Sequence, residues 1–306
     1  MDLVINVLEQ GLLFGIVAIG VYITYKILDF PDLSVDGTYP LGAAICAALL
    51  VKDVNPWLSV LIATIGGAIA GLATALLHVK LKITNLMSGI LVMIGLYSIN
   101  LMVMGQSNIP LFNTKSIFIG KYNIIVIILV TLIVKLAFDF FLKTKLGSLL
   151  IAVGDNEQLV TSLGVNKNNI KILGLMISNG LVALGGALAA QYQGFSDASM
   201  GTGVVVMGLA AVILGTSIFK KVNFIKYTTI SIFGAIIYKL AIAMALKFGL
   251  NPNYLKLMTA VIVIIALSLN SEVFKLKRRR KKVENTVINR EGGDVDAKDS
   301  SIAQSL

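Results

Sequence analysis

The chain has 306 residues, of which 57% are hydrophobic and 14% are charged, and its mean hydropathy is +0.87. Soluble domains usually contain about 45–50% apolar and about 25% charged residues. A water-soluble fold of this length cannot hide so much apolar surface. The composition therefore excludes one and predicts an all-α polytopic membrane protein.

The formal net charge of +10 is concentrated near the end of the chain. Seven of the eight residues 275–282 are lysine or arginine, directly after an apolar segment. Such a cluster is typical of the cytoplasmic flank of a last membrane helix, although a nucleic-acid patch would have the same composition. We expect a membrane domain over residues 1–274 and a tail over 275–306 that is basic at first and disordered from about Val283.

A membrane helix needs about 20 apolar residues, and the sequence contains nine candidate stretches. They lie near residues 9–28, 38–51, 57–77, 85–105, 123–143, 170–190, 203–219, 228–247 and 255–273. The second and seventh are short and follow polar, glycine-bearing segments, which predicts interrupted or re-entrant helices there. Because Met1-Asp2-Leu3 lacks the basic region of a signal peptide, we expect the first segment to be retained.

Lysines in the short loops predict the orientation of the helices. With the N-terminus outside, ten lysines fall at inward-facing ends and five at outward-facing ends. The basic tail adds to the inner side. Nine spans with a cytoplasmic C-terminus thus place the N-terminus outside.

Two segments, 30–38 and 195–202, resemble each other at a separation of 165 residues. Both contain Phe-x-Asp-x-Ser followed by Gly-Thr, and both precede a short apolar stretch. An odd number of spans separates the copies, so they should enter the membrane in opposite directions. This predicts an inverted repeat, whose interrupted helices line the substrate route in many transporters.

The residue types of the repeat suit a helix break inside a membrane, where unpaired backbone groups cost several kcal/mol each. Aspartate and serine can accept hydrogen bonds from freed N–H groups, and glycine permits turns. The pathway residues predicted on this basis are Asp32, Ser34, Gly37, Asp197, Ser199 and Gly201. The alternative is that they only cap helices at the membrane surface. Asp29 and Asp36 are interpreted as interfacial.

The longest predicted cytoplasmic connection, 144–169, contains the pattern of a short helix outside the bilayer. Asp155 can cap it, Gln158 stands three residues later as in a capping box, and Gly164 suits its C-terminal end. About eight residues would be helical, with Leu159, Val160 and Leu163 on one apolar side. A helix this short needs a partner surface, which can be the membrane interface or a groove in another subunit.

The segment Ala152–Val165 resembles the ATPase-coupling loop of ABC importer permeases of the ribose and branched-chain amino acid type. Asp32-Leu33-Ser34-Val35 with Gly37 resembles an intramembrane motif of the same permeases, and 190–215 resembles a later segment. The likeness covers about residues 10–270 and is nearest to the tryptophan/tyrosine-type branch. The extra N-terminal span of ribose-type relatives is absent here. By this resemblance, the ATPase-coupling residues are Gly154, Asp155, Asn156, Leu159, Val160, Leu163 and Gly164.

The resemblance implies a bacterial plasma-membrane importer with two permease chains, as a homodimer, and an external substrate-binding lipoprotein. ATP and Mg would bind two separate cytoplasmic ATPase subunits, since this sequence lacks a Gly-x-x-x-x-Gly-Lys-Ser/Thr loop. The permease itself would need no cofactor, be no enzyme, and bind membrane lipid but no nucleic acid. An amino acid-like solute would cross by alternating access. The alternative is a secondary transporter driven by an ion gradient, with the paired aspartates carrying the ion.

Overall fold

A computed structural model of the chain describes residues 2–118, 123–219, 226–249 and 254–270. One compact unit extends to Val263, and a second begins at Ile264, of which only the end of the last helix is described. The predicted basic and disordered tail, 275–306, lies outside the described residues.

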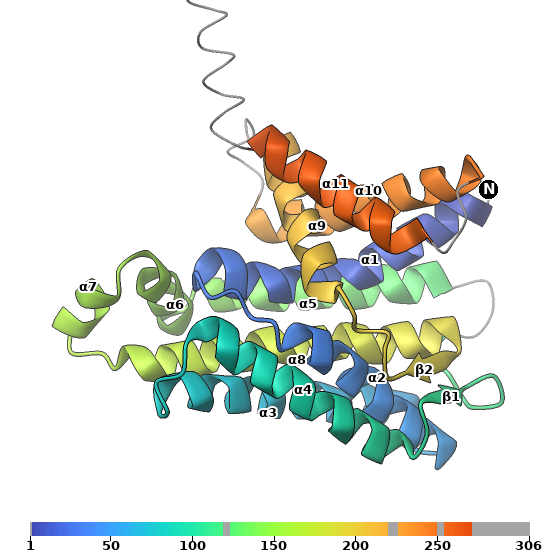
Figure 1. Cartoon of the computed structure of the whole chain (residues 1–306), viewed down its shortest axis with the longest axis horizontal. Helices are drawn as coiled ribbons and strands as arrows, with labels where there is room; N and C mark the ends of the chain where they lie inside the picture. Colours follow the sequence, from blue (N-terminus) through green and yellow to red (C-terminus); the bar gives the residue numbers. More distant parts are fainter. Residues whose placement is uncertain (1, 119–122, 220–225, 250–253, 271–306) are drawn as a thin grey trace, which may run out of the picture. The chain divides into compact units, whose positions relative to one another are not determined.

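The described residues form helices joined by short connections and one small sheet (Figure 1). The long helices are α1 Asp2–Tyr22 with the π-helical turn η1 Ile23–Ile27, α2 Val35–Val51, α3 Pro56–Val79, α4 Asn85–Met104, α5 Asn123–Leu142, α8 Lys167–Gln193, α9 Val204–Ile218, α10 Tyr227–Lys247 and α11 Leu255–Asn270. The shorter helices are α6 Lys145–Asp155 and α7 Glu157–Ser162. The strands β1 Asn108–Pro110 and β2 Phe195–Asp197 pair antiparallel, with Asn108 opposite Asp197.

Each of the nine predicted stretches contains a helix. Six helices among the described residues are long and apolar enough to cross a membrane, and Val35–Val51 and Val204–Ile218 are shorter apolar helices. The chain is therefore a polytopic helical membrane protein, and the count of nine crossings stays a prediction. The small sheet was not predicted, because three-residue strands have no periodicity to detect.

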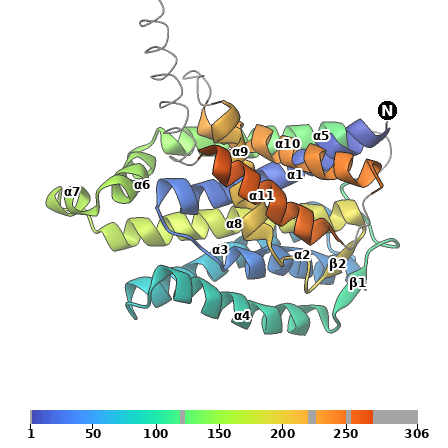
Figure 2. The ribbon, with the colours of Figure 1, turned by 45° about the horizontal axis from the view of Figure 1, so that its top comes forward.

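Helix α8 lies at the centre of the first unit and packs against α1, α2 and α3 (Figures 1 and 2). Glycines allow this close packing, as is common between membrane helices. A Cβ added to Gly71 of α3 would overlap the carbonyl oxygen of Leu175, and one added to Gly186 of α8 would overlap that of Tyr39. The close approach of α3 to α8 thus depends on the absence of a side chain at Gly71, and that of α2 to α8 on its absence at Gly186.

The two short helices, α2 and α9, meet at their N-termini. Asp36 in the first turn of α2 accepts hydrogen bonds from the backbone amides of Gly203 and Val205 at the start of α9. From there α2 extends to the C-terminal end of α8, where Cys46 contacts Gln191, and α9 extends to the C-terminal end of α1. The inverted repeat predicted from the sequence stays a prediction, as does the equivalence of its two copies.

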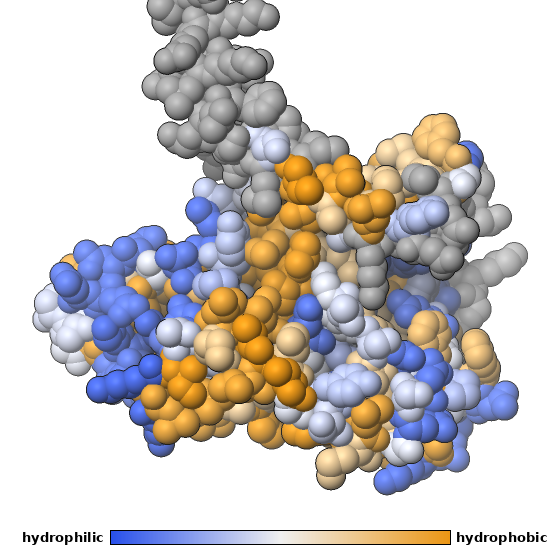
Figure 3. All heavy atoms as spheres, in the orientation of Figure 1, coloured by the Kyte–Doolittle hydropathy of each residue, from blue (hydrophilic) through white to orange (hydrophobic). Residues whose placement is uncertain are grey.

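The outward faces of α3, α4 and α5 are apolar. Exposed residues on these faces include Leu61, Ile65, Ile69, Leu91, Ile94, Leu129 and Ile133. Figure 3 shows hydrophobic surface over α4 and hydrophilic residues at the left end, over α6 and α7. Apolar side chains at this density on helix exteriors are typical of lipid contact.

Candidate functional site

Helices α6 and α7 form a polar element beside the long helices (Figure 1). Thr144 caps α6 by accepting a hydrogen bond from the Gly147 amide, 3.3 Å. The α6 residues Leu150 and Val153 are buried on the side of the helix that faces the protein core. A Cβ on Gly154 would overlap the carbonyl oxygen of Ile27, so α6 lies directly against the turn η1 that ends the first helix. This region, 144–169, was predicted as one loop with a single short helix, and the structure has two.

The N-terminal cap of α7 is Asn156, which corrects the prediction of Asp155. The Asn156 side chain accepts hydrogen bonds from the amides of Gln158 and Leu159, at 3.0 and 3.2 Å, whereas Asp155 ends α6. The helix has six residues rather than about eight. Gly164 has φ +76, as expected for a residue that ends a helix in the left-handed region.

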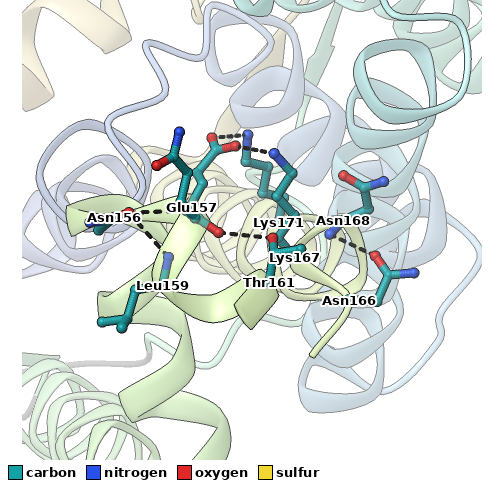
Figure 4. A network of polar contacts seen from close by, with 9 residues as sticks. Asn156, Glu157, Leu159, Thr161, Asn166, Lys167, Asn168 and Lys171 are labelled. Atoms are coloured by element: carbon teal, nitrogen blue, oxygen red, sulfur yellow. Dashed lines mark hydrogen bonds and ion pairs between the residues drawn. The ribbon is translucent and has the colours of Figure 1, made fainter. Parts of the chain in front are cut away.

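An ion-pair network fixes α7 to the start of α8 (Figure 4). The Glu157 carboxylate binds the ammonium groups of Lys167, 2.7 Å away, and Lys171, 2.5 Å away. Hydrogen bonds from these two lysines lower the pKa of the Glu157 carboxyl below its ordinary value. The network makes α7 an extension of α8, so the two helices should move together.

The apolar residues of α7 lie on two sides, which corrects the prediction of one apolar face. Val160 is fully buried in the protein's own core, whereas Leu159 and Leu163 are 52% and 66% exposed. Residues four apart share one face of a helix. Leu159 of α7 and Leu163, its C-cap, are therefore both exposed at this end of the molecule. The surface over α6 and α7 is otherwise largely hydrophilic (Figure 3).

At the start of α2, Asp32 is buried in a network with α8. Its carboxylate accepts a hydrogen bond from the Asn179 side-chain amide, 2.8 Å. The Asn179 carbonyl oxygen in turn accepts from the hydroxyls of Ser34, 3.2 Å, and Thr38, 2.8 Å. All four side chains are at most 3% exposed. The network connects the interrupted helix to the middle of α8.

Both copies of the sequence repeat form the same local turn. An Asp32 carboxylate oxygen accepts from the Ser34 amide at 2.8 Å, and one of Asp197 accepts from the Ser199 amide at 2.7 Å. The aspartates therefore bind their own turns and do not cap the first turns of α2 and α9. Their surroundings differ, because Asp197 lies in the small sheet, is only partly buried, and contacts Asn108. The Ser199 hydrogen bond lowers the pKa of the Asp197 carboxyl.

A cavity of about 460 Å³ lies between the start of α2, helix α4 and the segment that leads into α9. Of the predicted pathway residues, Gly37 and Ser199 line it, whereas Asp32, Ser34 and Asp197 do not. Gly201 lies beside it, and a Cβ there would overlap the Asp36 carbonyl oxygen. Only part of the predicted set therefore lies at this cavity.

The contacts of three polar residues near the start of α2 were not predicted from the sequence. Asp36 was expected at the membrane surface, and the structure places it between α2 and α9. Asn100 and Asn179 are fully buried within apolar helices. A side-chain amide in a membrane segment is costly unless it is paired or functional, so their isolation in apolar sequence was the available signal. Among the described residues, no cluster of His, Cys, Asp or Glu could hold a metal ion.

Six long apolar helices, two shorter apolar ones and a polar element beside them, among the described residues, define a polytopic membrane protein. The chain belongs to the family described as "Branched-chain amino acid transport system / permease component", whose model matches residues 3–267. The resemblance found in the sequence is thereby confirmed at the level of the family. No solved structure matches the chain.

Curated relatives cover most of the chain. It is 51% identical to the "Tyrosine transport system permease protein" of Clostridioides difficile (strain R20291), over 92% of this chain and 95% of that protein. It is 34% identical to an uncharacterized protein of Rickettsia prowazekii (strain Madrid E), over 88% of this chain and 98% of that protein. The ribose import permease protein RbsC of Escherichia coli (strain K12) is 24% identical, over 87% and 85%. Relatives with assigned functions are named as permeases, which places the chain among transport proteins and not enzymes.

Proposed function

We propose that the chain is the membrane-spanning permease subunit of an ABC importer for an amino acid or a related compound. The family description names a branched-chain amino acid transport system, and a relative of 51% identity is named for tyrosine transport. An aromatic amino acid is accordingly the first substrate to test.

The observation that carries the coupling to a separate ATPase is the outward face of α7. Leu159 and Leu163 are exposed together on a helix whose other side is packed and ion-paired to α8. Burying one leucine is worth about 1.5–3 kcal/mol, so a groove in a partner subunit would hold this face. Leucines on a polar, projecting element serve no purpose in packing this chain.

The same contacts provide a route from the ATPase to the solute path. Movement of α7 would act on α8 through Glu157, and α8 contacts α2 through Asn179 and Asp32. Gly154 would transmit it to the end of α1. The mechanism is alternating access, in which closure of the ATPase pair on binding ATP and Mg shifts these helices and opens the path beside α2 and α9.

The α7 end is cytoplasmic in this proposal, and the N-terminus lies outside. Most loop lysines fall on the α7 side, as the positive-inside rule requires. The full unit contains two copies of this chain as a homodimer, two ATPase subunits and an external substrate-binding lipoprotein, in a bacterial plasma membrane. The proposed pathway residues remain Asp32, Ser34, Gly37, Asp197, Ser199 and Gly201, of which Gly37 and Ser199 line the cavity.

Affinity purification of the full chain from its native host tests the proposal. An ATPase subunit should co-purify, and uptake of labelled tyrosine should require ATP hydrolysis by that subunit. Purification of the chain alone, with uptake abolished by collapsing the ion gradient, would overturn the proposal in favour of a secondary transporter.

A further inference from the structure

The cavity between α2, α4 and the segment that leads into α9 contains an acidic residue, Asp36. Its volume of about 460 Å³ falls in the range of small-molecule sites, about 300–1,000 Å³. Among the described residues that line it, Asp36 is acidic and none is lysine, arginine or histidine. Met93, Ile94 and Tyr97 of α4 form an apolar wall. A cavity of this kind attracts a cation attached to an apolar body.

The Asp36 carboxylate is held rigidly with spare acceptor capacity. One oxygen accepts from the Gly203 amide, 2.9 Å, and the other from the Val205 amide, 2.7 Å. An ionised carboxylate offers about four acceptor sites, so each oxygen can take a further hydrogen bond. Its orientation is fixed by backbone groups, which prepares it for a ligand without further loss of side-chain entropy.

Asn100, on α4, supplies a second acceptor. Its side chain is fully buried and lines the cavity, and its amide nitrogen donates to the Gly37 carbonyl at 3.2 Å. No hydrogen-bond donor of the described residues reaches its side-chain oxygen. A buried acceptor without a donor costs about 1–3 kcal/mol, and a bound donor would recover this energy.

The hydroxyl groups of the cavity add to the same bias. The Ser199 hydroxyl donates to Asp197 and the Thr202 hydroxyl donates to the Ser199 carbonyl. Because their protons are already used, they too can offer only acceptors to a ligand. The hydroxyls of Tyr97 and Ser98 also line the cavity and can donate or accept. The fixed acceptors around Asp36 favour a ligand that brings donors and a positive charge, and a primary ammonium group has three donors in a compact cation.

We propose that this cavity binds the primary ammonium group of the transported amino acid, with Asp36 and Asn100 as its acceptors. The inference rests on the proposed function, and it adds a recognition site within the permease itself. Met93 and Tyr97 contact the apolar side chain of the solute. The carboxylate of the solute is not recognised in this cavity.

The test uses the purified full-length chain in nanodiscs of phosphatidylglycerol, which has no primary amine. Equilibrium binding is measured with labelled tyramine, which keeps the ammonium, and with 3-(4-hydroxyphenyl)propionate, which keeps the carboxylate. Tyramine should bind saturably and the propionate should not. Asn100→Leu should weaken tyramine binding by about tenfold. Binding of the propionate alone would overturn the proposal.

Two substitutions of opposite charge at Ser98 distinguish a loss of ligand binding from a loss of folding. Ser98 suits this test because it lines the cavity and is exposed. Ser98→Asp should strengthen tyramine binding and Ser98→Lys should weaken it, each by about tenfold. Ser107→Lys, on an exposed residue outside the cavity lining, is the matched control and should change nothing. Equal affinities in both Ser98 variants would refute the site, since misfolding cannot raise affinity.

Lipid is the other source of an ammonium group. Nanodiscs containing phosphatidylethanolamine should leave tyramine binding intact, and loss of binding there would overturn the assignment to the solute. Co-purification of the ATPase with the same variants keeps the two proposals apart. An ATPase-bound chain without tyramine binding refutes only the ammonium site, whereas a chain without any ATPase refutes the importer.

Discussion

Asp32 and Asn179 are 147 residues apart in the sequence, and their side chains form a hydrogen bond of 2.8 Å inside the bundle. Asn179 also accepts from Ser34 and Thr38, so one amide of α8 organises the whole start of α2. A carboxylate in this position requires its partners, because burying a charge without hydrogen bonds is costly. This pair is the contact by which the central helix positions the helix break.

Replacing Asn179 by leucine should destabilise the protein. The change leaves the Asp32 carboxylate and two hydroxyls without their partner, and a lost buried partner costs about 1–3 kcal/mol per group. Thermal unfolding in detergent, followed by size-exclusion chromatography, measures the effect. Thr74→Val is the matched control, because the buried Thr74 hydroxyl bonds only to Ala70 of its own helix. Equal unfolding temperatures for the two variants would contradict the role of Asn179.

A methyl group at Gly154 should loosen the contact between α6 and the first helix. A Cβ there overlaps the backbone carbonyl of Ile27, which cannot move aside as a side chain would. Overpacking of this kind costs about 1–3 kcal/mol, and we expect Gly154→Ala to lower the unfolding temperature and ATPase co-purification together.

Gly95→Ala is the control for this substitution. Gly95 is also in a helix, yet a Cβ there meets nothing within 4 Å. The alanine should be neutral or stabilising by up to about 1 kcal/mol. An unfolding temperature for Gly154→Ala as high as that of Gly95→Ala would show that α6 does not pack on η1.

The ion pairs that attach α7 to α8 should weaken at acid pH. The pKa of Glu157 in the folded chain lies below the ordinary 4.5, since Lys167 and Lys171 stabilise the carboxylate. The stabilisation is therefore complete above 4.5 and is lost as the pH falls through the lowered folded value. A spin label on a cysteine at Ser162, in a Cys46→Ala background, should gain mobility in that window. In the Glu157→Gln variant the spin label should be mobile at every pH. A label mobility that does not change with pH in the chain that keeps Glu157 would contradict the ion pairs.

The two repeat aspartates can be tested together as pathway residues. Asp32→Asn with Asp197→Asn removes both charges and keeps the side-chain size, and we expect uptake to fall by about tenfold or more if both act on the path. The two single variants distinguish the contribution of the buried Asp32 from that of the partly buried Asp197. Normal uptake by the double variant, at equal amounts in the membrane, would leave these residues with a purely local role in their turns.

The positions of the long helices could be predicted from the sequence, because runs of apolar residues follow directly from the thickness of the bilayer. The matching turns at Asp32 and Asp197 could also be anticipated from the Asp-x-Ser pattern, although the pattern suggested helix caps. The partners of these turns could not be predicted. Asn179 and Asn108 are unrelated in sequence to the repeat, and only packing brings them to it.

Errors near α7 have a local cause. Asp155 and Asn156 are both good caps, and the choice between them is made by α6, which continues through Asp155. Helix α6 itself was missed because its two glycines are unfavourable in helices, while its contact with Ile27 requires one of them. The acceptor role of Asp36 was missed because it depends on the start of α9, which is far away in the sequence.

The central claim is that α7 is the cytoplasmic contact point for a separate ATPase. A photo-crosslinking amino acid at Leu163, in full chain expressed in its native host, tests it most directly. The account predicts a crosslink to the ATPase subunit, absent when the same group replaces the exposed Ile65 on α3. A crosslink at Leu163 only to lipid, or labelling of that position by a membrane-impermeant reagent added outside intact cells, would contradict the account.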